Sequence, residues 1–174
     1  MRRIAIEAGV TTGAITNYFE GREALLLEAV RTAHYAAGLR MQNAARHDAT
    51  AAERLEAVVL QALPLDGFRM REWRVWAAFR SALPGNSELW TANEAGYANW
   101  RRYLQALLRP ICIDGESSRR EASLLVALVD GIGFRLAAMA ENAQELASEQ
   151  VSVTEDIAAY LKDVLRRHRG PPRE

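Results

Sequence analysis

Apolar residues recur at helical spacing in every long segment of this sequence, and no segment shows the strict alternation of a half-buried strand. The segments are separated by glycine, proline or a capping residue, which commonly mark the starts and stops of helices. The pattern predicts an all-α fold. Helices are expected over residues 2–8, 12–19, 22–46, 51–63, 66–83, 87–109, 118–143 and 152–167.

Three of the expected helix starts rest on the capping-box pattern, in which Ser or Thr is followed three residues later by Glu. In such a box, each side chain satisfies a backbone N–H that would otherwise be unpaired. The three boxes are Thr50 to Glu53, Ser118 to Glu121 and Ser152 to Glu155. They predict where the fourth, seventh and eighth helices begin.

Composition excludes several classes of protein. With 174 residues, 49% of them apolar, the chain can bury a domain-sized core. The net charge is +0, so any nucleic-acid binding must come from a local surface. The single Cys112 and three scattered histidines predict neither a disulfide nor a metal site. The most apolar stretch, residues 124–140, is interrupted by Asp130 and Arg135, so we expect a cytoplasmic protein with no membrane partner.

Residues 4–19, IAIEAGVTTGAITNYF, have the pattern of two short helices joined by a tight turn at Gly9. Glycine can take the left-handed conformation that ends a helix sharply, and the turn has the length found in a helix-turn-helix. Six apolar residues can share a small core: Ile4, Ala5, Ala8, Val10, Ile15 and Phe19. The opposite face is small and polar, which suits close approach to base edges in a major groove. That face holds Thr12, Gly13, Thr16 and Asn17. This geometry alone leaves open any helical hairpin with a glycine turn.

Several fixed spacings occur together in the first 26 residues: Ile4-Ala5, Ala8-Gly9-Val10, Gly13, Tyr18-Phe19 and Arg22-Glu23-Ala24-Leu25-Leu26. In this combination they resemble the signature of TetR-type transcriptional repressors. The resemblance implies an all-α homodimer with N-terminal DNA-binding heads and a larger effector-binding domain. It assigns residues 1–46 to the head with its connecting helix, and residues 47–174 to effector binding and dimerisation.

The resemblance also implies roles for individual residues of the head. Thr11 would cap the recognition helix, and Arg22 would hold a phosphate at the start of the next helix. The residues nearest the bases would be Thr12, Gly13 and Ala14. Contacts to phosphates or bases would come from Thr16, Asn17 and Tyr18.

The family's head has three helices, and the first of them would precede Arg2. The sequence given begins at the second, so we expect the side chains that this helix would cover to be partly exposed. These are Ile4, Ala5, Ile15 and Phe19. We also expect the head to be loose or self-associating. An effector-binding dimer that does not bind DNA is therefore the alternative function.

Aromatic residues concentrate between residues 68 and 103, and all four tryptophans lie there. Aromatics at helical spacing are usually core, but a helical bundle also builds its ligand cavities among such side chains. We expect a largely apolar cavity between helices 51–63, 66–83, 87–109 and 118–143, lined by Trp73, Trp76, Phe79, Arg80, Trp100 and Phe134. The charged candidates for orienting a ligand are Arg74, Arg80, Arg101 and Asp130. A neutral apolar ligand is favoured over a cationic one. Residues 63–76 resemble the effector domain of betaine-regulator-like members of the family.

The helix expected over residues 118–143 is apolar on nearly all sides, so it needs both its own core and a second apolar partner surface. The final helix carries one apolar stripe. Paired across a twofold axis, the two helices would form a four-helix dimer interface. Its residues would be Leu128, Ile132, Leu161, Val164 and Leu165. A larger monomeric core is the alternative.

The expected function is a regulator that binds double-stranded operator DNA and acts as a repressor released by a small-molecule effector. The helix over residues 22–46 is the natural lever, because it joins the head to the effector domain. The sequence contains no nucleophile elbow, phosphate-binding glycine loop or paired metal ligands, so we expect neither an enzyme nor a cofactor.

Overall fold

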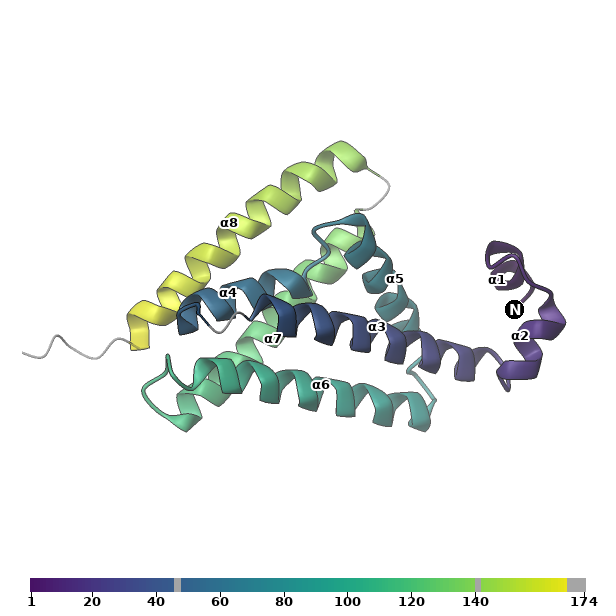
Figure 1. The fold of residues 1–174 in the computed structure, drawn as a ribbon, viewed down its shortest axis with the longest axis horizontal. Coiled ribbons are helices and arrows are strands. Elements are labelled where there is room, and N and C mark those ends of the chain that lie inside the picture. Colours follow the sequence, from purple (N-terminus) through teal and green to yellow (C-terminus); the bar gives the residue numbers. More distant parts are fainter. Residues whose placement is uncertain (46–47, 140–141, 169–174) are drawn as a thin grey trace, which may run out of the picture.

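The computed structural model describes residues 1–45, 48–139 and 142–168, and every regular element in these ranges is a helix (Figure 1). The predicted all-α fold is confirmed. The helices are α1 (Arg2–Glu7), α2 (Thr12–Tyr18), α3 (Arg22–Ala44), α4 (Ala51–Ala62), α5 (Gly67–Ser81), α6 (Ser87–Leu108), α7 (Gly115–Ala138) and α8 (Ala143–His168).

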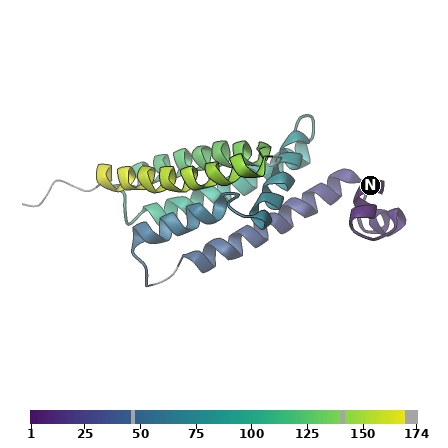
Figure 2. The ribbon, with the colours of Figure 1, turned by 90° about the horizontal axis from the view of Figure 1, so that it is seen from above.

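The long helix α3 connects two parts of the molecule. The short helices α1 and α2 lie beyond its N-terminal end, apart from the bundle that α4 to α8 form (Figures 1 and 2). Further along, α3 packs against α4, α5 and α6. One rigid element therefore reaches from the N-terminal pair into the bundle. Within the described ranges, no helix combines the length and apolar character needed to cross a lipid bilayer.

Side-chain caps fix several helix starts where the sequence predicts them. The predicted box at Thr50 is present: the Thr50 hydroxyl accepts from the Glu53 N–H at 3.2 Å, and the Glu53 carboxylate accepts from the Thr50 N–H at 2.8 Å. The Asp66 carboxylate caps α5 by accepting from the Arg69 N–H at 2.8 Å.

The predicted start of α7 at Ser118 is wrong. The helix begins at Gly115, and Asp114 caps it by accepting from the Ser117 N–H at 2.6 Å. Ser118 is fully buried inside the helix, and its hydroxyl donates to the Gly115 carbonyl at 2.9 Å. Asp is as good an N-cap as Ser, so the earlier cap decides where the helix begins. Residues 140–141 of the predicted helix lie outside the described residues.

The predicted start of α8 at Ser152 is also wrong, because the helix already begins at Ala143. The Asn142 side chain accepts from the Glu145 N–H at 3.2 Å and donates to the Glu145 carboxylate at 2.8 Å. The predicted capping box, Ser152 to Glu155, lies in the middle of α8. The backbone N–H groups there already have partners within the helix, so no cap is needed. The helix expected over residues 22–46 ends earlier than predicted, because α3 ends at Ala44, and Arg46 lies outside the described residues.

The core has two parts. The larger lies between α3, α4, α6, α7 and α8, and its fully buried members include Leu55, Leu63, Leu104, Leu108, Leu125, Leu136, Ile157 and Val164. The smaller lies where α3 meets α5 and the start of α6, and consists of Leu27, Val30, Phe79, Leu83 and Leu89. The second cluster sets α3 alongside α5, next to the cavity described below.

Candidate DNA-binding face and ligand cavity

The N-terminal pair has the geometry of a helix-turn-helix. The backbone turns at Gly9, whose φ of +66° lies in the left-handed region that favours glycine. The Val10 N–H donates to the Ala5 carbonyl at 3.0 Å and closes the turn. The Thr11 hydroxyl then caps α2 by accepting from the Ala14 N–H at 3.0 Å, as the sequence predicts.

The residues expected to contact DNA lie mostly in solvent. Ala14 is half-buried, and the others are exposed: Thr11, Thr12, Gly13, Thr16, Asn17, Tyr18 and Arg22. The largest of them, Tyr18, is 86% exposed. The Thr16 hydroxyl donates within α2 to the carbonyls of Thr12 and Gly13, both at 3.2 Å. Helical positions four apart share a face, so Thr12 and Thr16 lie on one face of α2, and Gly13 and Asn17 lie together in the same way.

The core that holds α1 and α2 together is smaller than the sequence predicts. Ala5 and Ile15 are buried at 2% and 7% exposure, although both were expected to be partly exposed. Phe19 is half-buried, and Ile4 is exposed, as expected. The separate assignment of Ile4, Ala8 and Val10 to the core between the two helices is wrong, because all three are exposed. Two helices of six and seven residues offer each other too little surface to cover six apolar side chains.

A cavity of about 430 Å³ lies inside the bundle. All six side chains expected to line a ligand cavity line it: Trp73, Trp76, Phe79, Arg80, Trp100 and Phe134. Of the charged candidates, Arg80 and Asp130 reach the cavity, whereas Arg74 and Arg101 are not among its lining residues.

The prediction missed the wall that α3 supplies. This wall consists of Val30, His34, Ala37, Gly38, Met41 and Gln42, whereas α4 contributes only Ala62. The signal was present, because these positions of α3 recur at helical spacing on one face. The connecting helix therefore forms part of the cavity itself, whereas it was expected only to join the head to the effector domain.

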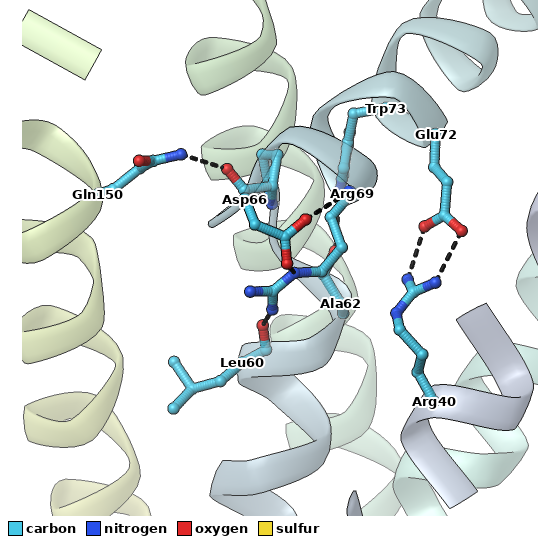
Figure 3. A network of polar contacts seen from close by, with 9 residues as sticks. Arg40, Leu60, Ala62, Asp66, Arg69, Glu72, Trp73 and Gln150 are labelled. Atoms are coloured by element: carbon cyan, nitrogen blue, oxygen red, sulfur yellow. Dashed lines mark hydrogen bonds and ion pairs between the residues drawn. The ribbon is translucent and has the colours of Figure 1, made fainter. Parts of the chain in front are cut away.

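Trp73 forms the aromatic floor of the cavity. Its ring meets those of Trp76 and Phe134 edge-on, at centroid distances of 5.1 and 5.0 Å. Its indole N–H donates to the Ala62 carbonyl at 2.9 Å (Figure 3). A Cβ at Gly133 would lie 2.2 Å from the Trp73 ring, so only glycine allows this ring to approach α7 so closely. Gly131, two residues earlier in α7, has no neighbouring atom within 4 Å of its Cβ position.

One edge of the cavity is polar. The Tyr97 hydroxyl donates to the Asp130 carboxylate, and the Arg80 guanidinium lies 3.9 Å from the same oxygen and over the Phe134 ring. Burial raises the pKa of the Asp130 carboxyl, although Tyr97 and Arg80 oppose this. Burial, followed by the bond to Asp130, raises the pKa of the Tyr97 hydroxyl well above its usual value. Arg80 thus balances the carboxylate, and the edge carries little net charge.

On the α3 wall, His34 is exposed as a whole residue, but partial desolvation of its imidazole lowers the pKa of that ring, against the opposing charge of Glu72. The His34 ring is therefore neutral at neutral pH. With the compensated pair on the opposite side, the cavity presents no uncompensated charge among the described residues that line it.

Two of the residues assigned to a dimer face are buried in the core of the single chain. Leu161 and Val164 are 3% and 0% exposed in the single chain, so that assignment is wrong. A single apolar stripe on a helix first covers the helix's own core, and α8 has only one such stripe. Leu128, Ile132 and Leu165 are half-buried. The large apolar side chains that α7 and α8 leave in solvent are Leu124 and Val151, at 47% and 62% exposure, and the prediction missed both.

One long helix carries the helix-turn-helix and also forms one wall of an aromatic-lined cavity in a helical bundle. This combination defines the class of a DNA-binding transcriptional regulator. Two family models match the chain. Residues 1–29 match the bacterial regulatory proteins of the tetR family, and residues 49–166 match the C-terminal domain of BetI-type transcriptional repressors. The chain belongs to the tetR family of bacterial regulatory proteins, and its C-terminal domain is of the BetI type.

Individual relatives agree with this assignment. The HTH-type transcriptional regulator PksA of Bacillus subtilis (strain 168) is 29% identical over 135 residues, which are 76% of this chain and 66% of PksA. The HTH-type transcriptional regulator BetI of Serratia proteamaculans (strain 568) is 26% identical over 173 residues, or 97% of this chain and 83% of BetI.

Solved structures share the fold. A transcriptional regulator from Rhodococcus sp. Rha1 superposes with a TM-score of 0.80 at 27% identity, over 98% of this chain and 87% of that one. A regulator structure from Pseudomonas aeruginosa PAO1, at 21% identity, has a TM-score of 0.66 over 97% of this chain and 83% of that one, and supports the fold alone.

Proposed function

We propose that this protein binds operator DNA through α2 as a homodimer, and that a small, neutral, mainly apolar molecule in the cavity releases it. The observation that carries the proposal is the double role of α3. At its N-terminal end this helix follows directly on α2, whose polar face is exposed, and further along it supplies one wall of the cavity. A ligand in the cavity therefore touches the element that carries the head.

Within this proposal, residues 1–46 form the head and its connecting helix, and residues 47–174 form the effector-binding and dimerisation domain. The DNA contacts are assigned to the exposed residues of α2 and to Arg22. The ligand contacts are assigned to Trp76, Phe79, Trp100 and Phe134. The protein acts without catalysis, in the cytoplasm.

The cavity chemistry supports a neutral ligand. Its walls are mostly aromatic and aliphatic, His34 is neutral, and Arg80 offsets Asp130. A charged ligand would lose its hydration on entering the cavity and would find no unpaired charge of opposite sign there, and burying an unpaired charge costs free energy.

The exposed strip along α7 and α8 supports a dimer. Leu124 and Val151 lie in solvent on α7 and α8. The same two helices also expose small residues that would permit close helix approach, namely Ala127, Gly131 and Ala147. We place the twofold contact on this strip together with Leu128, Ile132 and Leu165. Such a four-helix contact buries apolar surface that a monomer leaves in water.

The test is selection of bound duplexes from a random DNA pool, followed by affinity measurement on the enriched sequence. Enrichment of a sequence with two similar half-sites is expected, because a symmetric dimer reads a symmetric site. The alternative, an effector-binding dimer that does not bind DNA, draws on the exposure of Ile4 and Val10 in the head. No enrichment over a pool without protein would favour that alternative.

A further inference from the structure

The polar edge of the cavity brings together side chains from three helices. Asp130 extends from α7, and its Oδ2 accepts from the Tyr97 hydroxyl of α6. The Arg80 guanidinium of α5 lies 3.9 Å from the same oxygen. Among the described residues, no donor forms a hydrogen bond to the other carboxylate oxygen, Oδ1. The edge therefore holds an acceptor with unused capacity.

A molecule in the cavity can reach this acceptor. Asp130 lines the cavity, and its side chain is 24% exposed. Within the described part of the chain, the side-chain atoms buried without a partner belong to other residues, so Oδ1 is accessible. A ligand that covered Oδ1 without donating to it would leave a charged acceptor unsatisfied, which costs free energy.

The neighbours of Asp130 determine which kind of group it can bind. The Arg80 guanidinium is always charged and stabilises the ionised carboxylate, although burial raises the pKa of the Asp130 carboxyl. An ionised carboxylate accepts hydrogen bonds and cannot donate them. The Tyr97 hydrogen is already directed at Oδ2. The donor for Oδ1 must therefore come from the ligand.

Aromatic rings adjoin this edge. The Arg80 guanidinium lies over the Phe134 ring, 4.8 Å from its centroid, and Trp73 meets the Phe134 ring edge-on at 5.0 Å. Aromatic rings pack favourably against further rings. A volume of about 430 Å³ lies within the range of small-molecule sites. A flat ring system can thus lie among these side chains with one substituent beside Asp130.

We propose that the cavity selects a neutral aromatic molecule bearing a hydroxyl or N–H group, and that this group donates to Asp130 Oδ1. The inference deepens the proposed function and rests on it in taking this cavity as the effector site. The competing ligand is a cation held by the Asp130 charge. A cation gains less, because Arg80 already offsets that charge.

Two variants separate the acceptor role of Asp130 from a structural role. Asp130→Asn has nearly the same shape, and its amide oxygen can accept from Tyr97, which leaves the amide NH₂ in the place of Oδ1. The cavity then presents a donor instead of an acceptor. Tyr97→Phe removes the hydrogen bond between α6 and α7 but keeps the carboxylate, so it is the matched control for a structural role.

Three probes with the same ring system test the ligand chemistry by equilibrium dialysis against the full chain at neutral pH. 2-Naphthol can donate a hydrogen bond. 2-Methoxynaphthalene keeps the rings and the oxygen but can only accept. The trimethyl(2-naphthyl)ammonium cation carries a positive charge and no donor.

The wild type is expected to bind 2-naphthol about tenfold more tightly than 2-methoxynaphthalene, as for one hydrogen bond to a charged acceptor. Tyr97→Phe should keep this preference. Asp130→Asn should bind the two probes about equally, because both can accept from the amide. The proposal is overturned if the wild type binds neither probe or shows no preference, if Asp130→Asn keeps the preference, or if Tyr97→Phe loses it. Tighter binding of the ammonium probe than of 2-naphthol would also overturn it.

The Kd for the duplex enriched from the random pool is then measured with and without each neutral probe at saturation. If the preference is as expected but 2-naphthol leaves the duplex affinity unchanged, the ligand chemistry stands and the proposed release of DNA fails. If both neutral probes bind equally and both weaken duplex binding, the proposed function stands and the donor requirement fails.

Discussion

Arg40 and Glu72 join α3 to α5 through two parallel hydrogen bonds of 2.7 and 2.6 Å. The Arg40 side chain is 24% exposed, and its guanidinium lies over the Phe68 ring, with 5.3 Å between the guanidinium carbon and the ring centroid. A carboxylate as buried as Glu72 needs such a partner. The contact thus fixes the connecting helix at one defined point beside the cavity.

Glu72→Ala should lower the free energy of unfolding by about 2 kcal/mol, because it leaves the partly buried Arg40 without its partner. Urea denaturation followed by circular dichroism measures this. The control is Glu28→Ala, which breaks the exposed 3.8 Å pair with Arg31 and should change stability by less than about 0.5 kcal/mol. Equal effects of the two substitutions would show that the Arg40–Glu72 contact does not anchor α3.

Gly133→Ala should destabilise the protein by about 3 kcal/mol or more, because the new methyl group would overlap the Trp73 ring at 2.2 Å. The floor of the cavity would have to rearrange to accommodate it. Gly38→Ala, in the middle of α3 and facing open space, should be neutral or slightly stabilising. Thermal unfolding of the two variants separates these outcomes, and a stable Gly133→Ala variant would contradict the packing described here.

Arg22→Ala should weaken binding to all duplexes alike and reduce the salt slope of log K by about one, as expected for one lost phosphate contact. Thr12→Ala or Asn17→Ala should instead change which sequence is preferred, because these residues are assigned to base edges. Fluorescence anisotropy over a range of salt concentrations distinguishes the two effects. Arg31→Ala, on an exposed turn of α3 beyond the head, is the matched control and should leave the slope unchanged.

Leu124→Glu should dissociate the dimer, because it places a charge on the apolar strip of α7 while leaving the protomer core intact. Sedimentation at micromolar concentration should show a folded monomer. Leu161→Ala should instead destabilise the fold by about 2–5 kcal/mol, since that side chain lies in the protomer core. A monomeric wild-type protein would contradict the dimer, and a dimeric Leu124→Glu variant would contradict its placement on this strip.

The helical fold and the aromatic cavity follow from the sequence because both depend on local patterns. Helical spacing predicts each helix, and Trp73 and Trp76 stand out as bulky aromatic residues about one helical turn apart. The start of α7 was misplaced because Asp114 and Ser118 are both good caps, and only the packed structure buries Ser118. Leu161 and Val164 were assigned to the wrong surface because a stripe does not reveal what covers it. His34 was missed as a lining residue because it reaches the cavity only through the packing of α3 beside α5 and α6.

The central claim is that filling the cavity releases DNA, and a covalent occupant tests it most directly. Gly38 lines the cavity from α3, and its Cβ position faces open space. In a Cys112→Ser background, Gly38→Cys can be alkylated with monobromobimane, and mass spectrometry establishes complete reaction. The affinity for the enriched duplex is then measured before and after alkylation. The account predicts that the unmodified variant binds like the wild type, and that the alkylated dimer binds at least about tenfold more weakly. Equal affinity of the two forms, with the cavity occupied in every protomer, would contradict it.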